Sequence, residues 1–183
     1  MKKQIYYKTK YRSPLGCITI CCDEKENLVG LWFNGQKHFG DTINGKIIKK
    51  DNFKIFNKTK SWLDKYFVGE NLNIKDIPIK PIGSKFRQEV WKILCKIPYG
   101  KTITYGKIAK QIAQKFGKEK MSAQAVGNAV GHNPISIIIP CHRVVGTNGN
   151  LTGYASGIYK KIYLLKLENV NMNNLFIPKN GVV

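Results

Sequence analysis

The stretch that decides the fold of the C-terminal half is Ile135-Ser136-Ile137-Ile138-Ile139-Pro140-Cys141-His142-Arg143-Val144-Val145. The run over residues 135–139 is short and apolar, which is typical of a strand buried on both faces of a sheet. Pro140 has no backbone N–H, so it cannot continue a central strand. We therefore predict a buried strand over residues 135–139, with Cys141 where the strand gives way to a turn.

Cys141 is the candidate nucleophile of this chain. Its neighbours are the imidazole of His142 and the guanidinium of Arg143, and an electropositive setting lowers the pKa of a thiol and increases its thiolate fraction. The remaining cysteines show no C-x-x-C pair and no Cys/His spacing of zinc type, so neither a disulfide scaffold nor a metal site is predicted. They are interpreted as inert thiols: Cys17, Cys21, Cys22 and Cys95.

His142 is the candidate base for this thiol. Adjacent residues on extended backbone point to opposite sides, so contact between His142 and Cys141 requires a turn or a bridging water. An imidazole base also needs an acidic partner. After Ser84 the only carboxylate side chains are those of Glu89, Glu119 and Glu168, and Glu168 follows a helix predicted over residues 157–167. Spacing alone favours an ordinary solvated role for Glu168, and both interpretations stay open at this point.

Apolar residues at helical spacing predict further helices over residues 84–97, 104–113 and 122–130, with Ser84 and Thr104 as N-caps. The last two suggest a helix-turn-helix, although the joint over residues 114–121 is longer than usual. The helix over 122–130 consists of small residues. Such a helix suits either close packing in a core or close approach of its backbone to DNA.

The N-terminal half has a different pattern. Alternating residues and turn signals predict an antiparallel meander with strands over residues 5–9, 16–21 and 28–33. A helix is predicted over residues 57–68, followed by an irregular connector at 71–83. The fold class is therefore α/β, with an N-terminal domain over residues 1–76 and a mostly helical domain over residues 77–183.

The composition constrains the partners and the compartment. The chain of 183 residues carries 31 Lys and Arg against 11 Asp and Glu, a formal charge of +20. Such an excess makes nucleic acid the first partner to consider, while a general bias toward lysine is the competing explanation. No apolar segment has the features of a signal peptide or a membrane span. We expect a cytoplasmic protein with reduced thiols and no membrane association.

The block Pro140-Cys141-His142-Arg143-Val144-Val145, with Asn133-Pro134 before it and Gly153-Tyr154 and Leu164-Leu165 after it, resembles the O6-alkylguanine-DNA alkyltransferases. These proteins are also called methylated-DNA-protein-cysteine methyltransferases. Ser13-Pro14-Leu15-Gly16 and Tyr66-Phe67-Val68-Gly69 are similar to their N-terminal domain. The resemblance implies an RNase H-like α/β domain followed by a DNA-binding domain with a helix-turn-helix.

The resemblance also implies roles for individual residues. Cys141 would accept a methyl or alkyl group from O6 of guanine in double-stranded DNA, once per molecule. His142 would activate Cys141 through a water, and Glu168 would orient His142. The other implied site residues are Asn133 in the turn before the active site, Tyr105 as a hydrogen-bond donor to the flipped guanine or its phosphate, and Tyr154 with the Val144 backbone lining the pocket. No cofactor or metal is implied, a monomer is expected, and O4-alkylthymine stays open as a second substrate.

The helix over 122–130 would enter the minor groove of DNA. The DNA contacts expected there and beside the nucleophile come from Ser122, Ala123, Gln124, Ala125, Gly127, Asn128 and Arg143. Gln124 departs from the family pattern, because relatives commonly carry an arginine that fills the gap left by the flipped base. Glutamine can hydrogen-bond an orphan base but brings no charge, so support for base flipping is expected to be weaker.

Two other functions are considered. A non-catalytic lesion sensor of the alkyltransferase-like class would lack the cysteine at position 141, so the presence of Cys141 argues against it. A cysteine hydrolase would use Cys141 and His142 on an acyl substrate. That function leaves the helix of small residues and the charge of +20 without a purpose.

Overall fold

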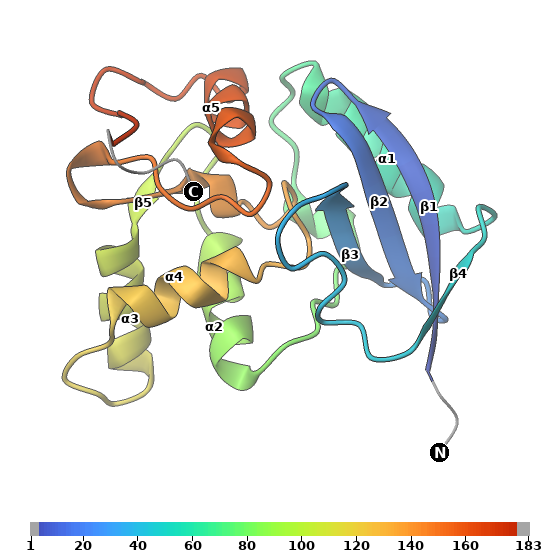
Figure 1. Cartoon of the computed structure of the whole chain (residues 1–183), viewed down its shortest axis with the longest axis horizontal. Helices are drawn as coiled ribbons and strands as arrows, with labels where there is room; N and C mark the ends of the chain where they lie inside the picture. The colour runs from blue at the N-terminus through green and yellow to red at the C-terminus, as the bar shows by residue number, and fades with distance from the viewer. Residues whose placement is uncertain (1–3, 179–183) are drawn as a thin grey trace. The chain divides into compact units, whose positions relative to one another are not determined.

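The computed structural model describes residues 4–178 of the chain. It divides into two compact units (Figure 1). The first comprises Met1–Gly83 together with Pro134–Ile138, and the second comprises Ser84–Asn133 together with Ile139–Val183. The domains predicted over 1–76 and 77–183 include residues 1–3 and 179–183, which lie outside the described residues.

The first unit contains a sheet with the strand order β3-β2-β1-β4. β1 (Ile5–Ser13), β2 (Gly16–Asp23) and β3 (Leu28–Phe33) are paired antiparallel in sequence order, which confirms the predicted meander. β4 (Lys46–Lys49) was not predicted, and it pairs in parallel with the start of β1. Every residue of β3 is buried, so this strand lies in the core of the unit.

A helix covers the sheet. α1 (Lys54–Phe67) packs on β1 and β2 (Figure 1) and buries the aromatic rings of Trp62 and Tyr66. This confirms the helix predicted over 57–68 and starts it three residues earlier. The segment after α1 has only a short 3-10 turn, η1 (Ile74–Asp76), in agreement with the predicted irregular connector.

The first unit continues beyond the boundary predicted at residue 76. The backbone N–H of Leu28 donates to the carbonyl of Pro78 at 2.8 Å, and the N–H of Lys80 donates to the carbonyl of Leu28 at 2.8 Å. Ile77 is buried. Residues 77–80 therefore run along β3, and the break in contacts falls after Gly83.

The prediction of a strand over residues 135–139 is wrong. Within this segment only Ile135 forms a β-bridge, to Leu31 of β3. A backbone hydrogen bond of 2.8 Å from Ile138 then closes a turn around Ile137, whose φ of 70° is strained for a β-branched residue. A short apolar run shows that a segment is buried but does not show whether it is extended. Here the isoleucines are buried in a turn.

The second unit is mostly helical. Its helices are α2 (Lys85–Leu94), α3 (Tyr105–Lys115), α4 (Ala123–Gly131) and α5 (Ile158–Leu167), which confirms the helices predicted from apolar spacing. The hydroxyls of Ser84, Thr104 and Ser122 accept N–H groups of the first turns of α2, α3 and α4. None of the helices within residues 4–178 has both the length and the apolar character needed to cross a bilayer.

Short elements connect these helices. β5 (Ile103–Thr104) pairs in parallel with β6 (Val144–Val145). A 3-10 turn, η2 (Cys141–Arg143), directly precedes β6, and a second one, η3 (Thr147–Gly149), follows it. The candidate nucleophile therefore lies between α4 and a strand that leads toward α5.

The structure shows the packing role considered for α4, whereas close approach to DNA stays a prediction. Val126, Ala129 and Val130 are buried, and the carbonyl of Ala129 accepts a hydrogen bond of 2.8 Å from the indole Nε1–H of Trp91 in α2. On the other side of the helix, Gln124 and Asn128 are exposed, and so is Ala123 in the first turn. α4 is therefore packed through one face and presents polar side chains to solvent on the other.

The cap of α3 gives a direct test of this local structure. Thr104→Val keeps the shape of the side chain but removes the hydroxyl that accepts the N–H of Lys107 at 3.2 Å. We expect the free energy of unfolding to fall by about 1 kcal/mol, the usual contribution of an N-cap. Urea denaturation followed by circular dichroism measures this change. The matched variant Thr102→Val, at an exposed position two residues earlier, should leave the midpoint nearly unchanged, and equal effects of the two variants would contradict the capping role.

Candidate active site

Cys141 is the first residue of η2 and is 5% exposed. Its backbone N–H donates to the carbonyl of Ile139 at 2.8 Å, which places the thiol at a tight turn around Pro140. The Nδ2 group of Asn133 donates to Sγ of Cys141 at 3.1 Å and to the carbonyl of Ile139 at 2.8 Å. Asn133 is 4% exposed, so a buried amide fixes both the sulfur and the backbone that carries it.

The prediction that the surroundings lower the pKa of Cys141 is wrong. Burial raises the pKa of this thiol above its ordinary value, and it outweighs the opposing effects of the Asn133 hydrogen bond, the Lys161 charge and nearby backbone N–H groups. The neighbouring guanidinium of Arg143 is directed elsewhere. The resting sulfur is therefore a thiol, and it needs a base to become a nucleophile.

That base is next to an acid, as predicted. Nε2 of His142 and Oε1 of Glu168 are 2.7 Å apart, and both side chains are completely buried. Burial alone would raise the pKa of the Glu168 carboxyl, but the hydrogen bonds from His142 and Arg143 and the charge of Arg143 hold that pKa well below its ordinary value. Glu168 is not the solvated residue that spacing alone allowed. It is the buried residue that ends α5.

The charge of Glu168 determines the tautomer of His142. An ionised carboxylate only accepts hydrogen bonds, so Nε2 carries the proton and donates it to Oε1. In the neutral imidazole, Nδ1 is then the basic nitrogen. Burial lowers the pKa of His142, which favours this neutral form.

Arg143 does not lie where a DNA contact requires it. It was expected to bind DNA, but it is 6% exposed and its N–H groups are engaged inside the protein. Nε donates to Oε2 of Glu168 at 2.7 Å, Nη2 donates to Oε1 at 3.0 Å, and Nη1 donates to the carbonyl of Ile97 at 2.6 Å. The carboxylate attracts the guanidinium inward, which the position of Arg143 two residues after Cys141 did not reveal.

Tyr105, the first residue of α3, lies near the nucleophile. Its hydroxyl donates to the carbonyls of Thr152 at 3.4 Å and Gly153 at 3.3 Å. Burial, and secondarily the charge of Cys141, raise the pKa of Tyr105, so it stays protonated and acts as a donor. The ring of Tyr154 is buried edge-on to that of His142, with 6.5 Å between the centroids. Tyr105 and Tyr154 therefore both lie beside the predicted chemical centre, which consists of Cys141, His142 and Glu168.

Lys161 of α5 was missed by the sequence analysis. Its side chain is fully buried, and Nζ donates to the carbonyl of Val144 at 2.6 Å and to that of Thr152 at 2.8 Å. Burial lowers the pKa of Lys161 to about 8. The available signal was helical spacing, because Lys161 lies three residues after Ile158 and four before Leu165 on the apolar face of the predicted helix.

The expected DNA contacts on α4 are distributed over its surface. Ala123, Gln124 and Asn128 are exposed, and Ala125 and Gly127 are partly buried. The hydroxyl of Ser122 accepts the N–H of Gln124 at 3.2 Å and that of Ala125 at 3.4 Å, so it also caps the helix. The structure thus brings the predicted chemical residues together, and Gly127 of α4 lies close to the ring of Tyr105.

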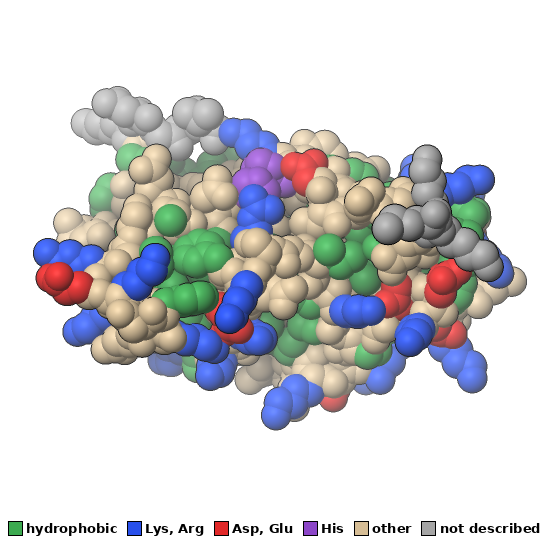
Figure 2. All heavy atoms as spheres, turned by 90° about the horizontal axis from the view of Figure 1, so that it is seen from below, with side chains coloured by type: hydrophobic (Ala, Val, Ile, Leu, Met, Phe, Trp, Pro, Cys, Tyr) green, Lys and Arg blue, Asp and Glu red, His purple; other side chains and the backbone are tan. Residues whose placement is uncertain are grey.

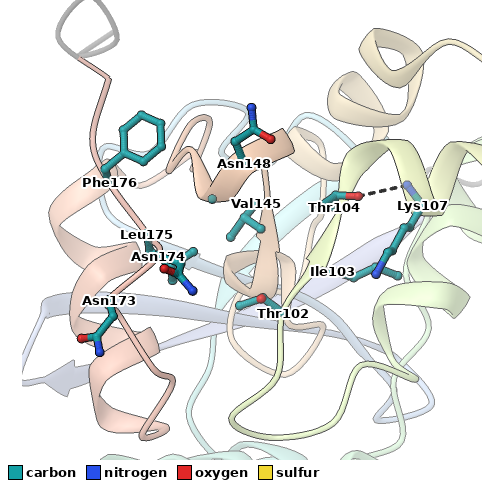
Figure 3. Close-up of a pocket in the computed structure, with 11 residues that line it drawn as sticks. Thr102, Ile103, Thr104, Lys107, Val145, Asn148, Asn173, Asn174, Leu175 and Phe176 are labelled. Carbon is teal, nitrogen blue, oxygen red and sulfur yellow. Dashed lines mark hydrogen bonds between the residues drawn. The ribbon is translucent and has the colours of Figure 1, made fainter.

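A pocket of about 590 Å³ lies in the second unit beside β5 and the start of α3 (Figure 3). Lys107, Asn148 and Phe176 are among its lining residues, whereas Cys141, His142 and Glu168 are not. Within residues 4–178, these last three residues also belong to no group of His, Cys, Asp and Glu side chains that could hold a metal ion.

The comparisons with known proteins agree with this geometry. Residues 6–81 match the family model of the 6-O-methylguanine DNA methyltransferase ribonuclease-like domain, and residues 85–170 match that of the DNA-binding domain. The methylated-DNA-protein-cysteine methyltransferase of Haemophilus influenzae is 39% identical over 164 residues, which are 90% of this chain and 87% of that protein. The chain belongs to the 6-O-methylguanine DNA methyltransferase family.

Other members of the methyltransferase family agree. The methylated-DNA-protein-cysteine methyltransferase of Methanosarcina barkeri is 45% identical over 166 residues, covering 87% of this chain and 95% of that protein. The crystal structure of Mycobacterium tuberculosis OGT in complex with DNA matches with a TM-score of 0.75 and 39% identity, covering 90% of this chain and 92% of that one. The methyltransferase described here thus shares their mixed α/β, two-domain organisation.

The hydrogen bond from Asn133 makes a prediction about the thiol of this methyltransferase. Asn133→Ala removes the donor that lowers the pKa of Cys141, so that pKa should rise further. The ¹³C shift of the cysteine Cβ, followed against pH, reports the ionisation of each thiol. Cys95, whose thiol pKa is also raised by burial, serves as the internal control and should not change. A pKa of Cys141 that stays the same or falls would contradict the role of this hydrogen bond.

Proposed function

We propose that this protein repairs DNA by transferring a methyl or larger alkyl group from O6 of guanine to its own Cys141. The observation that carries the proposal is the buried arrangement of one thiol, one imidazole and one carboxylate. The thiol is held by Asn133 at 3.1 Å, and the imidazole of His142 is held by Glu168 at 2.7 Å. In a member of this family, that arrangement supports the activity for which the relatives are named.

The transfer proceeds by in-line displacement. Nδ1 of His142 takes the proton of the Cys141 thiol, through a bridging water, and Glu168 stabilises the imidazolium that forms. The sulfur lone pair forms a bond to the alkyl carbon while the bond from that carbon to O6 breaks, and its electron pair goes to the purine. Cys141 becomes a thioether and the guanine is released once it is protonated or hydrogen-bonded.

Tyr105 is suited to assist the leaving purine. Its raised pKa keeps the hydroxyl protonated, so it can donate a hydrogen bond to a base that gains negative charge. In this proposal the base replaces the carbonyls of Thr152 and Gly153 as acceptor. Tyr154 and the Val144 backbone line the pocket that receives the base. Water does not cleave the thioether, so the thiol is not regenerated and each molecule reacts once. The transfer needs no cofactor.

The DNA would be bound by α3 and α4 acting as a helix-turn-helix. The joint between them includes the exposed residues Lys118 and Lys120, which can contact phosphates, and Ala123 lets the backbone of α4 approach a minor groove. Figure 2 shows Lys and Arg side chains spread over the face of the molecule that it draws. Gln124 fills the space left by the flipped base with a neutral side chain.

The remaining expectations are proposals of the same kind. We propose that the first unit has the RNase H-like fold, that the protein acts as a monomer on double-stranded DNA, and that it works in the cytoplasm. The free thiols of all five cysteines support a reducing compartment. The presence of Cys141 favours alkyl transfer over a lesion sensor without chemistry.

Mass spectrometry of the intact protein after incubation with DNA that contains O6-methylguanine tests the proposed reaction. We expect one added methyl group per molecule, located on the peptide that contains Cys141. Cys141→Ala should stay unmodified and still bind the same DNA, because the α4 surface is intact. Methylation of another cysteine, or release of many repaired guanines per protein molecule, would show that the mechanism is wrong.

The acid in the proton chain is tested by Glu168→Gln. The variant keeps the shape of the side chain but loses the charge that stabilises the imidazolium, so transfer at neutral pH should slow by about 10²-fold or more. The rate should recover in part as the pH is raised, because the thiol then ionises without help. Single-turnover kinetics on protein shown to be folded by circular dichroism measures both effects. A rate equal to that of the unmodified protein at neutral pH would remove Glu168 from the mechanism.

A further inference from the structure

The guanidinium of Arg143 has no part in the transfer described above, and its position is incompatible with the DNA contact expected from the sequence. We propose that Arg143 is a positioning residue for the reaction: it fixes the carboxylate of Glu168 and supplies its counter-charge, so that His142 stays neutral until it accepts the proton of Cys141. This inference rests on the proposed function. It concerns the protonation state of His142 before alkyl transfer begins.

The hydrogen bonds to Glu168 show how the carboxylate is shared. Oε1 accepts Nε2–H of His142 at 2.7 Å and Nη2–H of Arg143 at 3.0 Å. Oε2 accepts Nε–H of Arg143 at 2.7 Å and the backbone N–H of Gly100 at 3.3 Å. Arg143 thus holds both oxygens through two parallel N–H groups, which is the strong bidentate geometry of an arginine and a carboxylate. The rotation of the carboxylate is fixed, and with it the orientation of the imidazole.

Charge balance gives the second part of the argument. Glu168 carries one negative charge in a buried place, and an unpaired buried charge is strongly destabilising. Of the side chains that donate hydrogen bonds to it, two can balance it: Arg143, which is always charged, or His142 in its protonated form. Because Arg143 already balances this charge, protonation of His142 would leave an excess positive charge inside the protein. Neutral imidazole is therefore the resting form.

The other groups around His142 agree with this balance. From α5 it faces Glu168 and Lys161, from the segment before α5 it faces Tyr154, and within η2 it adjoins Cys141 and Arg143. Burial lowers the pKa of His142 most strongly, the Glu168 interaction raises it, and the charges of Arg143 and Lys161 lower it. Removal of Arg143 would leave Glu168 with His142 as its nearest source of positive charge.

Arg143 is itself anchored. Its Nη1 group donates to the carbonyl of Ile97 at 2.6 Å, and the guanidinium lies 5.7 Å from the centre of the Tyr99 ring. The turn between α2 and β5, whose Gly100 N–H also donates to Glu168, therefore holds the guanidinium as well. A lysine could supply the charge, but it has no planar fork to hold both carboxylate oxygens.

The test is the titration of His142 in Arg143→Met, followed by NMR of the imidazole, together with single-turnover transfer from O6-methylguanine DNA as a function of pH. The midpoint of His142 should rise by about one to three units, as expected for loss of a close positive charge. The pH at which the transfer rate falls on the acid side should rise by the same amount. Below both midpoints transfer should be at least about tenfold slower than in the unmodified protein, because a one-unit shift reduces the neutral imidazole tenfold, and at high pH the two rates should converge.

Two further variants complete the design. Arg143→Gln keeps an N–H donor for Glu168 but no charge, and it replaces Arg143→Met if that variant does not fold; it should show the same rise in midpoint. Arg143→Lys keeps the charge and should leave the midpoint close to that of the unmodified protein. Lys118→Met, which removes one exposed positive charge from the joint between α3 and α4, is the matched control. It should weaken DNA binding and leave the His142 titration unchanged.

The outcomes are distinct. An unchanged His142 midpoint in a folded, uncharged Arg143 variant overturns the inference, and so does an equal shift in Arg143→Lys. If these variants lost as much DNA affinity as Lys118→Met, Arg143 would be a DNA contact, as the sequence analysis expected, and the inference would be wrong. Because the imidazole titration needs no alkyl transfer, a shifted midpoint without methylation of Cys141 would contradict the proposed function and support the charge role of Arg143.

Discussion

The buried carboxylate of Glu168 is the interaction on which the rest of the site depends. It ends α5, and it receives hydrogen bonds from η2 through His142 and Arg143 and from the turn after α2 through Gly100. Segments separated by about seventy positions along the chain are thus joined at one anion. The energy of such a group is favourable only while every partner is present, because a buried charge without donors is costly. The buried carboxylate and the groups that donate to it are therefore stable only together.

The turn after α2 shows how closely the backbone must approach this anion. Gly100 has φ of 72°, and a Cβ atom added there would lie 2.8 Å from the backbone oxygen of Glu168. Glycine meets both requirements, since it adopts positive φ readily and leaves room for the end of α5. The hydroxyl of Tyr99 in the same turn donates to the carbonyl of Leu167 at 3.2 Å. This turn therefore holds the end of α5, and it also holds Arg143 in place.

A thiol inside this site is protected and unreactive until it is activated. Burial raises the pKa of Cys141, which disfavours the thiolate and so limits oxidation and unwanted alkylation of a residue that reacts only once. Reactivity then depends on a neutral base and on a donor for the leaving purine. In the proposed reaction His142 and Tyr105 would meet these needs with opposite properties, since burial lowers the pKa of the imidazole and raises that of the phenol. The same low-polarity surroundings therefore prepare one group to accept a proton and the other to donate a hydrogen bond.

The sequence by itself determined the features that depend on neighbours along the chain. Apolar spacing and cap residues such as Thr104 predicted the helices, and alternation predicted the meander of β1–β3. The order of residues around Cys141 predicted a nucleophile and its base, and the family resemblance added Glu168 as the acid. The apolar run over residues 135–139 correctly indicated burial. Its turn at Ile137 could not be predicted, because side-chain polarity reports where a segment lies and not its backbone angles.

Only the tertiary structure decided the properties that depend on solvent and on distant partners. The raised pKa of Cys141, the fully buried Lys161 and the inward position of Arg143 all follow from which segments surround these groups. An arginine two residues after a cysteine can face DNA or a carboxylate, and local spacing is the same in both cases. Glu168 lies 25 residues further along the chain, and it attracts Arg143 because the fold removes that carboxylate from water and leaves it in need of a positive partner.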